Sequence, residues 1–171
     1  MEQLNVSYLP TLEDHINMTL EKLNMSVPKE NKIIFRIIGA IAVMCATAGF
    51  IYLNENIIQT ICWIILTAAG LFIISYYDIT RPYLERSRAS RFYNYHKKDL
   101  CSKTVMIKDG KLIVSDEASK VKIPFDFIYR VRQTKNTVFI FYDEVHFCYI
   151  PVRVLSEAQI KELSELKNKG N

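Results

Sequence analysis

Two long apolar runs dominate the pattern of hydrophobic and polar positions along the chain. They cover residues 33–53 and 57–77, and the triplet Asn54-Glu55-Asn56 separates them. A helix rises about 1.5 Å per residue, so each run is long enough to cross the roughly 30 Å of bilayer hydrocarbon. The second run carries no charge, and the first carries only Arg36. The pattern predicts a transmembrane hairpin of two helices; a buried helical hairpin in a soluble core is the alternative.

The charges that flank the hairpin predict its orientation. Lys29, Lys32 and Arg36 precede or open the first run, and the connecting triplet has no basic residue. Residues 78–99 follow the second run and combine aromatic side chains with these basic residues: Arg81, Arg86, Arg88, Arg91, Lys97 and Lys98. The positive-inside rule places both termini in the cytoplasm. We expect residues 78–99 to form a basic juxtamembrane helix that contacts the anionic leaflet through these six cations.

Small residues recur along one face of the first apolar run. They are Gly39, Ala42, Ala46 and Gly49, spaced three and four residues apart. Small side chains let helix backbones approach closely in lipid. The expected partner is the second helix, which carries small residues at 67–70; a homo-oligomer that associates through the same stripe is the alternative.

Outside the hairpin, the spacing of apolar residues changes between the period of a strand and that of a helix, which predicts a small α+β domain. Residues 1–28 contain an alternating strand pattern and then an amphipathic helix, which Thr11 and Asp14 open as a capping box. From Lys103 the period is two, and Asp109-Gly110 is a strong hairpin turn. The segment that starts at Lys103 contains five to six short antiparallel strands, including the two that flank this turn. Ser156 with Gln159 then caps a final helix. Residues 100–171 therefore predict a curved antiparallel sheet or half-open barrel closed by a C-terminal helix, to which the N-terminal strand adds.

Catalytic and metal-binding patterns are missing from the sequence. The four cysteines, Cys45, Cys62, Cys101 and Cys148, have no paired spacing, and two of them lie inside the apolar runs. His146 and Cys148 share one face of a strand, which is half a zinc site at most. The sequence has no Gly-rich phosphate loop, no nucleophile elbow and no nucleic-acid motif. We expect no enzyme activity, cofactor, metal or nucleic-acid partner.

A basic set in the β domain is the best candidate for binding. It consists of Arg130, Arg132, Lys135 and Arg153. Arg130 and Arg132 share one side of a predicted strand, and Arg153 is expected on a later strand. Such a cluster suits a phospholipid headgroup or an acidic protein partner. The alternative is a solvated sheet face balanced by nearby carboxylates, and exposed aromatic side chains on the same sheet would favour a protein partner.

Nearly the whole chain resembles the YcxB-like family of small bacterial membrane proteins. The resemblance rests on "SYLPTLEDHINMTL" at 7–20, on the twin apolar runs and above all on "IPFDFIYRVRQTKNTVFIFY" followed by "YIPVRVLS". Many relatives carry Trp where this chain has Phe125. The resemblance implies a pleckstrin-homology-like cytoplasmic domain on a two-pass protein of the bacterial inner membrane, and it supplies no catalytic residues.

Three functions are compatible with these patterns. The first is a non-enzymatic interaction or sensing module held at the membrane, with a protein partner of unknown identity. The second is an immunity protein that protects its host from a membrane-active or secreted bacterial toxin. The third is a membrane-bound enzyme. Copurification with a resident partner would favour the first function. Survival that improves only in the presence of a cognate toxin would favour the second. Loss of activity on replacing one polar residue such as His146 would favour the third.

Overall fold

The computed structural model describes residues 4–53 and 55–166. The chain is an α+β protein that folds into two compact units. One unit is the middle of the chain, Lys22–Ser87, and the other combines the two ends, Met1–Glu21 and Arg88–Asn171.

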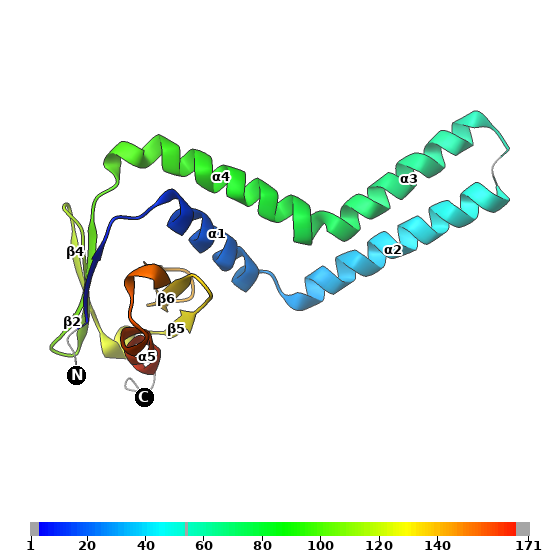
Figure 1. Ribbon diagram of the computed structural model, residues 1–171. Coiled ribbons are helices and arrows are strands. Elements are labelled where there is room, and N and C mark those ends of the chain that lie inside the picture. Colours follow the sequence, from blue (N-terminus) through cyan, green and yellow to red (C-terminus); the bar gives the residue numbers. More distant parts are fainter. Residues whose placement is uncertain (1–3, 54, 167–171) are drawn as a thin grey trace. The chain divides into compact units, whose positions relative to one another are not determined.

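Two antiparallel helices form the middle unit. They are α2 (Lys29–Tyr52) and α3 (Ile57–Ser75), which lie side by side (Figure 1). α2 begins directly after Pro28, and α3 begins at Asn56, whose side chain accepts a hydrogen bond from the Gln59 amide at 3.0 Å. Both helices are long and apolar enough to cross a membrane. The predicted turn lies between them, with Asn54 outside the described residues.

Glycines bring the backbones of α2 and α3 into contact. A Cβ atom added to Gly39 would lie 2.6 Å from Ile74 Cγ1 and 2.7 Å from the Gly70 carbonyl oxygen. A Cβ atom added to Gly49 would lie 2.5 Å from the Trp63 ring. The small-residue stripe therefore packs on the second helix of the same chain, as expected. Association of two chains through this stripe stays a prediction.

The second helix continues beyond its apolar part. A π-helical turn, η1 (Tyr76–Thr80), joins α3 to α4 (Arg81–His96), and a short 3-10 turn, η2 (Lys97–Asp99), follows. The basic segment is helical as predicted, but the π-helical turn was not foreseen. The Arg81 amide donates a hydrogen bond to the Tyr76 carbonyl five residues earlier, which is the spacing of a π-helix.

Two antiparallel sheets form the other unit. The first has the order β1-β2-β3-β4 and the second the order β5-β6-β7. The strands of the first sheet are β1 (Asn5–Tyr8), β2 (Lys103–Lys108), β3 (Lys111–Ser115) and β4 (Lys120–Pro124). Those of the second sheet are β5 (Arg130–Gln133), β6 (Thr137–Phe141) and β7 (Phe147–Pro151).

The strands predicted as a curved sheet or half-open barrel form two antiparallel sheets, and the division has a local cause. Pro124 ends β4, and the 3-10 turn η3 (Phe125–Phe127) interrupts the ladder before β5 begins. The expected Asp109-Gly110 turn joins β2 to β3 with positive φ angles of 53° and 70°. The N-terminal strand adds to the sheet as expected, because Val6 of β1 pairs with Val105 of β2.

The core of this unit lies between the two sheets and under the last helix. α5 (Glu157–Glu165) starts with the predicted capping box of Ser156 and Gln159. The core gathers residues from both ends of the chain: Leu4, Val6, Tyr8, Val105, Leu112, Ile123, Ile128, Val138, Ile140, Ile150, Leu163 and Leu166. Residues 100–171 alone would lack the side chains that β1 contributes to this core.

Candidate interaction surface

Two of the predicted basic residues lie on β5. Val131 packs on the core, so Arg130 and Arg132 on either side of it point to the outer face of the second sheet. The Arg130 guanidinium carbon lies 4.7 Å from the centroid of the Phe141 ring. Its Nε is buried without a hydrogen-bond partner among the residues that the structure describes. Arg132 is exposed, so β5 offers one cation stacked on an aromatic ring and one open cation.

The other two predicted residues line a polar recess of about 290 Å³. Lys135 lies in the turn between β5 and β6. Arg153 was expected on a strand, but it lies in η4 (Val152–Val154), the 3-10 turn that follows β7. The recess is lined by Thr11, Glu13, Asp14, Asn17, Lys135, Asn136, Val152 and Arg153. The basic set is therefore divided between the face of β5 and this recess.

Arg153 is engaged by a buried carboxylate that sequence reasoning did not pair with it. Its Nε and one terminal nitrogen donate to the two oxygens of Asp14 at 2.9 Å and 2.6 Å, and the same terminal nitrogen donates to the Leu9 carbonyl at 3.2 Å. Asp14 lies in α1 (Leu12–Ser26) and also completes the predicted capping box with Thr11. One carboxylate thus caps a helix and anchors it to the sheet.

The electrostatics of Asp14 follow from these contacts. Burial by itself raises the pKa of the carboxyl, but the hydrogen bonds from Arg153 and Thr11 outweigh burial and leave the pKa below its ordinary value of 3.8. Asp14 is 7% exposed and the Arg153 side chain 49% exposed. The pair is therefore charged at neutral pH and serves as a structural anchor, which makes Arg153 a weaker candidate for partner binding than Arg132.

A second anchor holds α1 on the β5–β6 turn. The Glu21 carboxylate accepts hydrogen bonds from the Thr134 hydroxyl and, at 3.0 Å, from the Asn136 amide. Asp14 and Glu21 are two helical turns apart, so they lie on the same side of α1. The helix consequently lies along one end of the second sheet.

Aromatic side chains are exposed at the opposite end of the second sheet. Tyr129 precedes β5, Tyr142 follows β6, and the Tyr129 amide donates to the Phe141 carbonyl at 2.8 Å. Tyr129 is 55% exposed, and Phe127 in the preceding turn is 69% exposed. Tyr and Arg are enriched where proteins bind proteins. We name Phe127, Tyr129 and Tyr142 the β5 patch; Arg132 points to the other face of β5, and sequence reasoning did not find the aromatic residues.

His15 of α1 packs against α4. Its ring stacks on Phe92 of α4 with centroids 5.4 Å apart, and it lines a small recess of about 170 Å³ with Tyr93, His96 and Lys103 among others. Burial, with a smaller contribution from Lys103, lowers the pKa of His15. The Tyr93 hydroxyl also donates to the Pro10 carbonyl at 3.3 Å. These contacts fasten the start of α1 to the end of α4.

No metal site forms among the described residues. His146 lies before β7, where its Nδ1 is 2.7 Å from an Asp143 oxygen. Cys148 packs against the core, and burial raises the pKa of its thiol to about 12. Within residues 4–53 and 55–166, no three His, Cys, Asp or Glu side chains come together in a group that could hold a metal ion.

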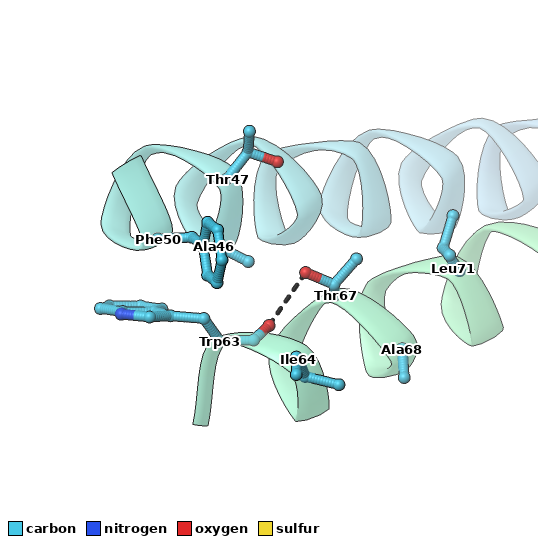
Figure 2. A pocket seen from close by; sticks show the side chains of 8 residues that line it. All are labelled: Ala46, Thr47, Phe50, Trp63, Ile64, Thr67, Ala68 and Leu71. Atoms are coloured by element: carbon cyan, nitrogen blue, oxygen red, sulfur yellow. Dashed lines mark hydrogen bonds between the residues drawn. The ribbon is translucent and has the colours of Figure 1, made fainter. Parts of the chain in front are cut away.

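The hairpin carries an apolar groove of about 400 Å³ between its two helices (Figure 2). Ala46, Thr47 and Phe50 line it from α2, and Trp63, Ile64, Thr67, Ala68 and Leu71 line it from α3. The Thr67 hydroxyl donates to the Trp63 carbonyl at 2.9 Å, so it is satisfied within its own helix. The groove offers shape and apolar surface but no reactive group.

Charged and aromatic residues meet at the other end of the hairpin. Arg36 forms an ion pair with Asp78 of η1 at 2.6 Å, and Arg81 lies 5.4 Å from the centroid of the Tyr77 ring. Of the six predicted surface cations, Arg81, Arg86, Arg88 and Arg91 lie in α4, and Lys97 and Lys98 lie in η2. The partner of Arg36 was not predicted, because Asp78 is 42 residues away in the sequence.

These observations define an α+β protein with a helical hairpin and a domain of two antiparallel sheets. Residues 107–167 match the family model described as YcxB-like protein. The match confirms the family resemblance over that segment, which runs from β2 through α5. No curated protein and no solved structure matches the chain.

Proposed function

We propose that the protein is a two-pass membrane protein that presents a non-enzymatic interaction domain on the cytoplasmic side. The observation that carries the proposal is the pairing of β1 with β2. The hairpin lies between these strands in the sequence, so both of its ends lead into one folded domain. Two segments of the same sheet must lie on the same side of a bilayer, and this requires an even number of crossings.

Exposure of the hairpin supports a bilayer environment over a soluble core. Only 17% of the apolar window in α2 and 6% of that in the second helix are buried. Ile51, Ile57 and Ile65 are each more than 60% exposed. Large apolar side chains in such numbers are stable in hydrocarbon and unstable in water. The basic residues of α4 support a cytoplasmic location of both flanks.

The domain architecture supports an interaction module. Two antiparallel sheets with four and three strands, closed by one helix, are compatible with the pleckstrin-homology-like domain that the family resemblance implies. Exposed aromatic side chains on the β5 patch favour a protein partner over a solvated face.

Photocrosslinking in intact cells tests the interaction role. A photoreactive residue at Phe127 or Tyr129 samples the β5 patch, and the same residue at Lys161 of α5 is the matched control on a different surface. We expect one protein adduct of the same mass from both patch positions and none from position 161. Equal, diffuse labelling from all three positions would contradict a specific partner at this patch.

A further inference from the structure

The outer face of the first sheet carries a cluster of lysines. Val105, Leu112 and Ile123 point into the core, and alternation along each strand sends their neighbours outward. Four exposed lysines share this outer face: Lys108, Lys111, Lys120 and Lys122. The ladder places Lys108 directly opposite Lys111, and Lys122 opposite Ile113 on β3, which lies on this side of the sheet but is only 7% exposed. We call these four residues the lysine face.

No acidic side chain occupies an outward strand position on the same face among residues 4–53 and 55–166. The other outward positions on the strands are Asn5, Ser7, Thr104, Met106, Ile113, Ser115 and Pro124. Among the described residues none of the four lysines forms an ion pair. The nearest acidic residues in sequence lie in turns, and Asp116 there accepts hydrogen bonds from the Ala118 and Ser119 amides. Among the described residues, the outward strand positions of this face therefore carry lysines and no acidic side chain.

Stability of the sheet does not explain the arrangement. Like charges directly opposite each other in a ladder are destabilising, and lysine is a poor strand former. Lysines on edge strands protect a sheet from pairing with other chains, which accounts for Lys120 and Lys122 on β4. β2 and β3 are inner strands, so edge protection leaves Lys108 and Lys111 unexplained.

We propose that the lysine face docks on the anionic headgroups of the bilayer to which the hairpin tethers the domain. This inference rests on the proposed membrane function. Protein interfaces are depleted in lysine and enriched in aromatic residues, and none of the outward positions on β1–β4 is aromatic. Four exposed lysines without an aromatic neighbour on the same face suit a layer of phosphate groups better than a protein hot spot. The tether also raises the effective concentration of the bilayer.

Each lysine near an anionic leaflet strengthens attachment about fivefold. Four of them strengthen it more than a hundredfold if all reach the surface. The attraction falls off within a Debye length of about 8 Å at physiological salt, so raised salt weakens it. The β5 patch, which lies on the other sheet, stays free for a protein partner.

Lysine footprinting on the full chain in lipid nanodiscs tests the docking. The probe is an amine-acylating reagent, read by peptide mass spectrometry, in discs of phosphatidylcholine alone or with phosphatidylglycerol. We expect acylation of the lysine face to slow at least about fivefold in the anionic discs and to recover at high salt. Lys161, which lies on α5 outside the lysine face, is the internal control and keeps its rate.

Paired variants separate docking from general charge. Lys111→Gln with Lys122→Gln should weaken the attachment by about 25-fold and so reduce the protection of Lys108 and Lys120, whereas Lys161→Gln should leave it intact. Equal rates in both disc types, with the protein fully incorporated, would overturn the docking and leave the proposed function standing. Failure of the protein to incorporate would overturn both. Protection that appears only with a copurifying acidic protein would also overturn lipid docking.

Discussion

Replacement of Arg153 by methionine should destabilise the domain by about 2–3 kcal/mol. The change removes the guanidinium from the Asp14 carboxylate, which is 7% exposed in the native chain, and leaves the Thr11 hydrogen bonds as its remaining ones. Loss of one partner from a fully buried pair costs about 3–5 kcal/mol. Arg153 is half exposed and its charge remains partly hydrated. We therefore expect a cost of about 2–3 kcal/mol, below the range for a fully buried pair. Methionine keeps much of the apolar stem of arginine, which limits the loss of packing.

Urea titration of the full chain in micelles, read by pulse proteolysis, measures this cost. Arg132→Met is the matched control, because Arg132 is exposed on β5, and it should change the free energy of unfolding by less than about 0.5 kcal/mol. In an Asp14→Asn background, Arg153→Met should cost less than about 1 kcal/mol, because the ionic partner is already missing.

The pH dependence gives an independent check of the pair. The folded pKa of Asp14 lies below its ordinary value of 3.8, so the stability from the pair is present above that value and is lost as pH falls through the folded pKa. The deficit of Arg153→Met should therefore shrink below about pH 4. A deficit that is independent of pH, or equal in the Asp14→Asn background, would refute the role assigned to the ion pair.

Three further predictions concern other contacts. Gly39→Ala should separate α2 from α3 and lower the stability of the hairpin by about 1–3 kcal/mol. Thermal unfolding in micelles measures this loss, and Ala40→Leu on the exposed side of α2 should have little effect. Arg36→Asp should weaken the hairpin by no more than about 1 kcal/mol, and the charge-swapped double variant with Asp78→Arg should restore it; no restoration would rule out an ionic contact. The neutral, packed His15 has a lowered pKa, so its contribution is present above about pH 6.5 and is lost as pH falls towards the folded value. His15→Phe should flatten this part of the stability curve, and an unchanged curve would show that another group titrates.

Local patterns in the sequence predicted the elements that depend on neighbouring residues. The apolar runs gave α2 and α3, the Asp109-Gly110 turn joined two strands, and two capping boxes marked the starts of α1 and α5. The N-terminal strand pairs with the β domain as expected. Each of these features is encoded within a few residues, by period or by a capping side chain.

Features that depend on distant residues were missed. Asp14 was identified as a cap, but its ion pair with Arg153 joins residues 139 positions apart. The period-two pattern identified strands without showing that the turn at Phe125–Phe127 divides them between two sheets. The lysine face was missed because its members come from three strands, and only the register shows that they share a side. Part of this information was present, since alternation alone places Lys120 and Lys122 together.

Cysteine accessibility in intact cells tests the central claim most directly. In a background with Cys45, Cys62, Cys101 and Cys148 replaced by serine, Glu55→Cys samples the hairpin turn. Ser7→Cys with Thr104→Cys samples the strands on both sides of the hairpin, whose native hydroxyl oxygens lie 2.8 Å apart. We predict that a membrane-impermeant maleimide labels position 55 in intact cells. As single variants, positions 7 and 104 should instead become reactive only after permeabilisation, and in the double variant the two cysteines should crosslink to each other under oxidising conditions. Labelling of all three positions alike, or of position 55 only after permeabilisation, would contradict a two-pass protein with its domain in the cytoplasm.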